Sequence, residues 1–188
     1  MNRSISLAVA AVAMQSLAVA MPLNGAVAQQ MQRISFQAPA AVAEYTQQHF
    51  IDVGDLAGHQ LRVFEVHTTF KDMPVINGAA VKELWTRGFS DFTRNSGSTR
   101  VFYIYVCENG DKLFARLIGI AHKSGSGFTL AAAGDITGGT GKFVGMRGTI
   151  RTILTADPAA NEHEGQTVIE YALGGEGETD ALAMPPLQ

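Results

Sequence analysis

The chain has 188 residues, of which 46% are hydrophobic and only 16% are charged, and its formal net charge is −3. This length fits one domain with a core large enough to be stable without disulfides, and the single cysteine, Cys107, cannot form an intrachain disulfide. The small net charge and the absence of Lys/Arg runs argue against a nucleic-acid partner and against a basic membrane-binding patch.

The first 28 residues have the pattern of a secretory signal peptide. Arg3 supplies a positive charge, an apolar stretch rich in Ala, Val and Leu follows over 4–21, and the Ala-Val-Ala sequence at 26–28 is typical of a cleavage site. The alternative is an uncleaved membrane anchor, but the stretch is rich in Ala rather than Leu, and no later segment is apolar enough to span a bilayer. We therefore expect a secreted or periplasmic protein that has no membrane span after cleavage.

Residues 29–58 show little hydrophobic periodicity. We interpret them as an N-terminal arm in which 44–58 could form a short helix, although Gly54 and Gly58 disfavour one. Beyond Gly58 the pattern changes to a period of two over 61–70, with one set of side chains at 61, 63, 65 and 67 and the other at 62, 64, 66 and 68, and β-branched and aromatic residues predominate. This alternation predicts a strand.

The rest of the chain predicts short strands joined by turns. Residues 101–107 are apolar on both faces, and the Asn-Gly pair at 109–110 that follows is a strong hairpin signal, because both turn positions require positive φ. We expect strands over 81–93, 101–107, 112–121, 128–137, 143–155 and 167–173, and a disordered tail over 174–188. Seven or eight such strands without a long helix indicate an all-β sandwich or a closed barrel over 59–173.

Several sequences that suggest enzyme chemistry do not fit it. The Gly-Gly-Thr-Gly-Lys sequence at 138–142 lacks the glycine spacing of a P-loop and of a dinucleotide-binding motif, so a tight turn is the better interpretation. No two histidines are spaced as metal ligands, and no nucleophile elbow is present. We therefore expect no metal and no cofactor.

Glu65 is a carboxylate within an otherwise apolar strand. If its side of the strand lines a barrel, burial would raise its pKa and suit it to proton transfer. If that side faces outward, Glu65 is a solvated surface residue. The pattern by itself favours the outward position, because Glu65 shares its side of the strand with His67.

Two short stretches resemble known families. Residues 63–67, Val-Phe-Glu-Val-His, followed by Met73 and Pro74, are similar to the first barrel strand and the following loop of the allene oxide cyclases. Residues 136–148, which contain Gly-Gly-Thr-Gly-Lys-Phe, are similar to a turn and strand shared by allene oxide cyclases and dirigent proteins. The resemblance covers roughly 60–173 and implies an eight-stranded, calycin-like antiparallel barrel that forms a homotrimer.

The resemblance also implies roles for single residues. Glu65 falls on the carboxylate that steers the reacting intermediate, Pro74 on the proline that borders the pocket, and Arg147 on an arginine that faces the cavity. His67 and Met73 stand where the allene oxide cyclases have Asn and Ser.

Together these arguments predict a hollow that holds a small hydrophobic molecule. Polar side chains would orient that molecule, although each of them has an alternative position at the rim or on the surface. The candidate ligand-binding residues are His67, Pro74, Tyr103, Tyr105, Arg116 and Arg147.

Three functional hypotheses follow. The first is an isomerase or cyclase of the allene oxide cyclase type, with Glu65 as the catalytic acid/base or charge-stabilising group. The second is a non-catalytic barrel that binds a hydrophobic ligand. The third is a structural barrel whose interior is filled by its own side chains, namely Phe102, Ile104, Phe114 and Ile118.

Overall fold

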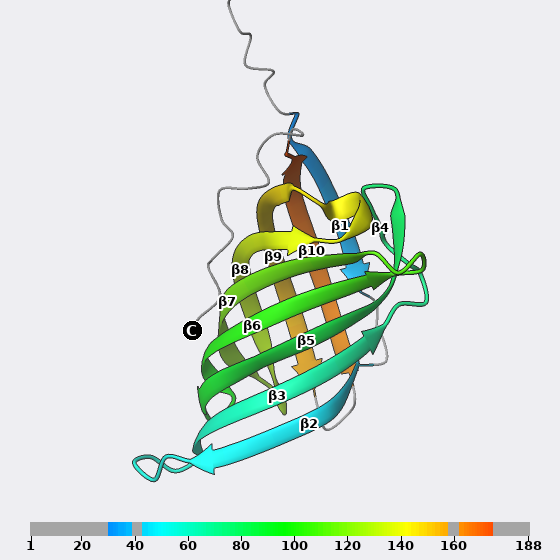
Figure 1. Cartoon of the computed structure of the whole chain (residues 1–188). Helices are drawn as coiled ribbons and strands as arrows, with labels where there is room; N and C mark the ends of the chain where they lie inside the picture. Colours follow the sequence, from blue (N-terminus) through cyan, green and yellow to red (C-terminus); the bar gives the residue numbers. More distant parts are fainter. Residues whose placement is uncertain (1–29, 39–42, 158–161, 175–188) are drawn as a thin grey trace, which may run out of the picture.

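We describe the protein from a computed structural model, which covers residues 30–38, 43–157 and 162–174 (Figure 1). The expected signal peptide over 1–28 lies outside the described residues, as does the expected tail beyond Gly174. Among the described residues, no helix is long and apolar enough to cross a membrane.

The described residues form antiparallel strands and one short 3-10 turn. In chain order these elements are β1 (Gln32–Ala38), β2 (Ala43–Asp52), β3 (His59–Thr69), β4 (Val75–Ile76), β5 (Ala79–Thr93), β6 (Ser96–Cys107), β7 (Lys112–Ser124), β8 (Gly127–Gly139), η1 (Gly141–Phe143), β9 (Met146–Asp157) and β10 (Glu162–Leu173). The sheet order is β1-β10-β9-β8-β7-β6-β5-β3-β2, and β4 pairs only with β5. The antiparallel all-β fold expected from the sequence is confirmed.

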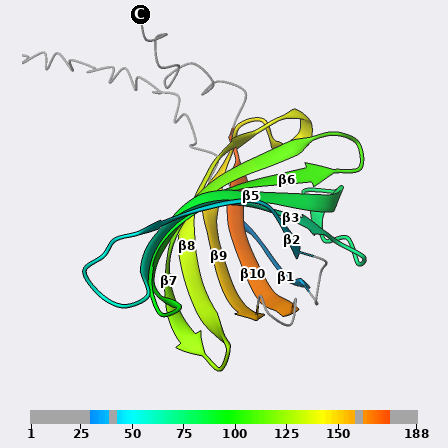
Figure 2. The ribbon, with the colours of Figure 1, turned by 90° about the horizontal axis from the view of Figure 1, so that it is seen from below.

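The sheet curves strongly but does not close into a barrel (Figures 1 and 2). β1 and β2 occupy the two ends of the strand order, and no pairing joins them among the described residues. The expected closed, eight-stranded barrel is therefore wrong in its closure and in its number of strands. The segment 29–58, where an arm or a short helix was expected, contains both edge strands of the sheet, and the two-residue strand β4 is a further addition.

The alternation of side chains along β6 shows how the sequence selects the two faces of the sheet. Val101, Tyr103, Tyr105 and Cys107 point inward and are buried, whereas Phe102 between them is 49% exposed. β7 alternates in the same way and leaves Ile118 on the outside. The residues expected to fill a structural barrel, Phe102, Ile104, Phe114 and Ile118, thus belong to the outer face. When both faces of a strand are apolar, the sequence pattern cannot determine which one points inward.

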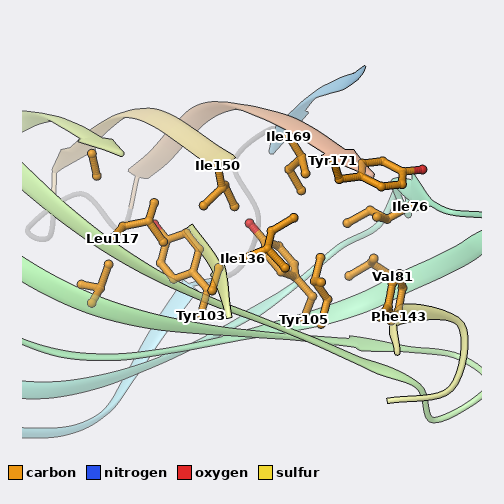
Figure 3. Packing of buried hydrophobic residues seen from close by; sticks show 14 of the residues in the cluster. Ile76, Val81, Tyr103, Tyr105, Leu117, Ile136, Phe143, Ile150, Ile169 and Tyr171 are labelled. Atoms are coloured by element: carbon orange, nitrogen blue, oxygen red, sulfur yellow. The ribbon is translucent and has the colours of Figure 1, made fainter. Parts of the chain in front are cut away.

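One end of the interior is closely packed (Figure 3). Ile76, Val81 and Phe143 are fully buried there, and burying a large apolar side chain stabilises the fold by about 1.5–3 kcal/mol. Two hydrogen bonds of 2.7 Å join the β4–β5 turn to η1: the Asn77 amide donates to the carbonyl of Lys142, and the Lys142 ammonium donates to the carbonyl of Gly78. Asn77 and Gly78 both have positive φ, as an Asn-Gly turn requires.

Candidate functional site: a hollow with a polar end

The interior beyond the packed end is hollow, with a volume of about 130 Å³. Its walls come from β1, β2, β3, β5, β6, β8, β9 and β10, so that nearly every strand contributes one or more side chains. Most of these side chains are apolar or aromatic, including Phe36, Tyr45, Phe64, Phe92 and Leu130. An apolar hollow of this kind is the usual form of a site for a small hydrophobic molecule.

Two phenols of β6, Tyr103 and Tyr105, also line this hollow. Figure 3 shows their two side chains next to each other. Their rings meet edge to face with centroids 5.9 Å apart. Thr152 and Thr167, whose hydroxyls are hydrogen-bonded to each other at 3.0 Å, line the hollow beside them. Burial raises the pKa of Tyr103 to about 12 and raises that of Tyr105 well above its ordinary value. Both phenols are therefore neutral at physiological pH, and they can orient a ligand by hydrogen bonding without taking its proton.

Arg62 carries the positive charge at the boundary of the hollow. It extends from β3, and its guanidinium carbon lies between 5.0 and 6.0 Å from the centroids of four aromatic rings, those of Tyr45, Phe50, Phe64 and Phe92. Its Nη1 donates a long hydrogen bond of 3.5 Å to Oε1 of Gln48. No carboxylate among the described residues lies within 4.0 Å of this guanidinium. Arg62 is thus held in place by aromatic rings rather than by an opposite charge.

A second, polar pocket of about 220 Å³ adjoins the hollow. The two spaces share Arg62 and Phe92, and the polar pocket also contains Gln60, Ser90 and Arg94. Its remaining lining residues, Phe50, Gly58 and Asn95, place it near the β2–β3 and β5–β6 connections.

Ser90 has an unusual environment in this polar pocket. It is directly opposite Arg62 in the pairing of β3 with β5, and only 1% of its surface is exposed. Its Oγ is buried and has no hydrogen-bond partner among the described residues. Leaving a buried hydroxyl unpaired costs about 1–3 kcal/mol, so a bound group that pairs with it would recover part of this free energy.

The structure places Glu65 on the outer face of the sheet, opposite to the hollow. The inward-facing residues of β3 are Arg62, Phe64 and Val66, and Glu65 points the other way between them. Its Oε1 accepts a hydrogen bond of 2.6 Å from the Thr46 hydroxyl, and its Oε2 accepts one of 2.6 Å from Nε of Arg87.

The environment of Glu65 is the opposite of what a general acid requires. The hydrogen bond from Thr46, with a further contribution from Arg87, lowers the pKa of Glu65 despite some desolvation. The idea of an inward-facing carboxylate with a raised pKa is therefore wrong. The outward position, which the pattern itself favoured, is the one found.

The other candidate residues are separated from the hollow. His67 lies on the outer face, where its Nε2 is 2.7 Å from Oε2 of Glu83 and its ring stacks on Trp85 with centroids 4.2 Å apart. Pro74 is in the loop before β4, and its carbonyl accepts a hydrogen bond from the Val81 amide.

Both candidate arginines are exposed. Nη2 of Arg116 lies 3.9 Å from Oδ2 of Asp135, and Nη1 of Arg147 donates to the carbonyl of Met146. Of the six candidate ligand-binding residues, only Tyr103 and Tyr105 line the hollow.

Arg62, the one charged residue among the described lining residues of the hollow, was not predicted from the sequence. Arg62 is a charged residue between apolar neighbours on β3, which is the same signal that drew attention to Glu65. Ser90 and Thr152 gave no such signal, because a small hydroxyl residue is common on either face of a strand.

The chemistry that the hollow can supply is limited by its lining. The described lining residues include no carboxylate, histidine, lysine or cysteine, and the two β6 tyrosines, Tyr103 and Tyr105, remain protonated. Cys107 is buried elsewhere in the core, and burial raises the pKa of its thiol to about 11. No group of three or more potential metal ligands occurs among the described residues. This lining can bind and orient a molecule, but it offers no general base.

Two solved structures with a similar fold are the pterocarpan synthase dirigent proteins GePTS1 and PsPTS1. The first shares 12% sequence identity with a TM-score of 0.46 and is matched over 79% of this chain and 88% of its own. The second shares 11% identity with a TM-score of 0.45, over 79% of this chain and 97% of its own. No family model and no curated protein sequence matches this chain. Neither of these two structures is an allene oxide cyclase.

Proposed function

We propose that the protein is a non-catalytic binding protein that holds a small hydrophobic molecule inside its curved sheet. The observation that carries this proposal is the hollow itself, which has aromatic and aliphatic walls and two neutral phenols but no general base in its described lining. A cyclase that uses Glu65 does not fit this geometry, because that carboxylate is paired with Arg87 on the opposite face.

The size of the hollow limits the ligand. An engineered apolar cavity of about 150 Å³ in another protein accommodates benzene, and the hollow described above measures about 130 Å³. The part of the ligand enclosed by the sheet is therefore comparable to one aromatic ring or a short branched chain. The rest of a larger ligand would extend into the adjoining polar pocket.

A pair of valines on β3 allows a direct test of this function. Val66 lines the hollow, whereas Val63 is 59% exposed on the outer face. The neutral fluorophore N-phenyl-naphthylamine should bind the wild-type protein. Val66→Trp should fill the hollow and weaken binding by about tenfold or more, a loss of at least ~1.4 kcal/mol, whereas Val63→Trp should leave binding unchanged. Equal effects of the two substitutions, or no binding to the wild-type protein, would refute the proposal.

We also propose that the protein is exported and self-associates, as the signal-peptide pattern and the family resemblance led us to expect. The outer face of β6 and β7 exposes Phe102, Ile118 and Ile120 by about half of their surface each. Apolar residues grouped in this way are typical of an association surface. Native mass spectrometry of protein purified from its own host would report the subunit number, and a monomer at micromolar concentration would contradict self-association.

A further inference from the structure

The position of Arg62 connects the two internal spaces. Its side chain and that of Phe92 line both the apolar hollow and the polar pocket. A molecule whose apolar part lies in the hollow would therefore meet a guanidinium group where it leaves the hollow. The four surrounding aromatic rings keep that guanidinium at the boundary between the two spaces.

The charged side chains that line the two spaces are both arginines. The polar pocket contains a second guanidinium, that of Arg94, whose Nε donates to the carbonyl of Ala57. Neither space has a carboxylate among its described lining residues. The nearby exposed carboxylate of Asp52 accepts a hydrogen bond of 2.7 Å from the Gln60 amide. Two arginines without a paired acid favour an anionic group.

Ser90 gives independent support for a missing ligand group. Its buried hydroxyl faces the same pocket, directly across the strand pair from Arg62, and has no partner among the described residues. An oxygen atom held by Arg62 would provide the acceptor that this hydroxyl lacks. A planar guanidinium matches two oxygens of a carboxylate in a bidentate arrangement.

We propose that Arg62, with Ser90 and Arg94, binds the carboxylate of an amphipathic ligand whose apolar body occupies the hollow. This inference rests on the proposed binding function and makes it more specific, because it names an aryl- or alkyl-carboxylic acid as the ligand class. If only transfer out of water mattered, an alcohol with the same apolar body would bind better than the acid, since moving a carboxylate out of water is costlier than moving an alcohol. A preference for the acid would therefore report a specific interaction with the protein.

The test compares phenylbutyrate with phenylbutanol, which share the same apolar body. Each compound would displace N-phenyl-naphthylamine from the protein at neutral pH. For the wild-type protein we expect the acid to compete at about tenfold lower concentration than the alcohol, as a charge-assisted hydrogen-bonded pair would give. Arg62→Gln should abolish this preference, and Arg62→Lys should retain part of it.

Two further variants control for structural effects. Arg100→Gln removes an outer-face arginine that also lies over an aromatic ring, 5.8 Å from the centroid of Phe89, and it should keep the full preference for the acid. Ser90→Ala should weaken the binding of the acid by about threefold and leave the binding of the alcohol unchanged. The measured quantity is the ratio of the concentrations at which the acid and the alcohol compete for one protein. A substitution that loosens the hollow affects both compounds equally and leaves this ratio unchanged.

The outcomes separate the two proposals. If the fluorophore binds but the acid has no advantage over the alcohol, or if Arg62→Gln keeps that advantage, the carboxylate site is refuted and the hydrophobic binding function stands. If the fluorophore does not bind the wild-type protein, the binding function is refuted and the carboxylate site with it.

Discussion

Both faces of β3 carry charged residues, but within the described part of the chain those on the outer face are paired with opposite charges and the one on the inner face is not. On the outer face, Glu65 is paired with Arg87 at 2.6 Å and His67 with Glu83 at 2.7 Å. On the inner face, Arg62 contacts aromatic rings and has no acidic partner among the described residues. A charged side chain that is already paired within the protein has a structural role that requires no ligand. A partly buried charge without a counter-ion is a candidate for ligand recognition.

The largest expected effect tests whether the two faces differ in polarity as described. Val66→Asp would place a carboxylate among the apolar side chains of the hollow, and we expect it to lower the free energy of unfolding by roughly 2 kcal/mol. Val63→Asp puts the same group on the exposed face, where a change within roughly 0.5 kcal/mol is typical. Urea unfolding of both variants measures the difference. Similar losses would mean that the two sides of β3 are not distinguished by burial.

A smaller effect should separate two buried hydroxyls that are neighbours across β5 and β6. Thr99 donates a hydrogen bond of 2.8 Å to the carbonyl of Phe89, whereas Ser90, its register partner, has no hydrogen-bond partner in the part of the chain that the structure describes. Thr99→Val should therefore destabilise the protein by about 1 kcal/mol, and Ser90→Ala should be neutral or slightly stabilising. Thermal unfolding in the absence of ligand would show this, and a Ser90→Ala variant less stable than Thr99→Val would contradict the assignment.

Much of the sheet could be predicted from the sequence, because most strands from β3 onward alternate clearly or follow an Asn-Gly turn. The edge strands could not. β1 is seven residues long and pairs with β10, more than a hundred residues away, so nothing near it in the sequence indicates its role. β2 has almost no buried residues, and a strand exposed on both faces shows no hydrophobic alternation.

The candidate site was harder to predict for a related reason. Choosing between Glu65 and Arg62 requires the register of β3, and a shift of one residue exchanges its faces. The family resemblance singled out Glu65, whereas the alternation of Arg62, Phe64 and Val66 was equally visible in the sequence. Only the pairing of β3 with β2 and β5 determines which set faces the hollow.

The smallest expected effect concerns the pH dependence of stability, and it tests whether Glu65 acts within the fold. The hydrogen bonds from Thr46 and Arg87 lower the pKa of Glu65 below its ordinary value of 4.5 in the folded protein. A lowered pKa in the folded state means that the unfolded chain binds the proton more readily. The stabilisation is thus fully present above pH 4.5 and is lost as the pH falls through the lower, folded-state pKa. Glu65→Gln should therefore be less sensitive than the wild-type protein to acidification below pH 4.5, as measured by the urea midpoint. It should also leave N-phenyl-naphthylamine binding unchanged, because the side chain is on the face opposite to the hollow. A loss of binding would contradict this placement and would mean that Glu65 contributes to the binding site.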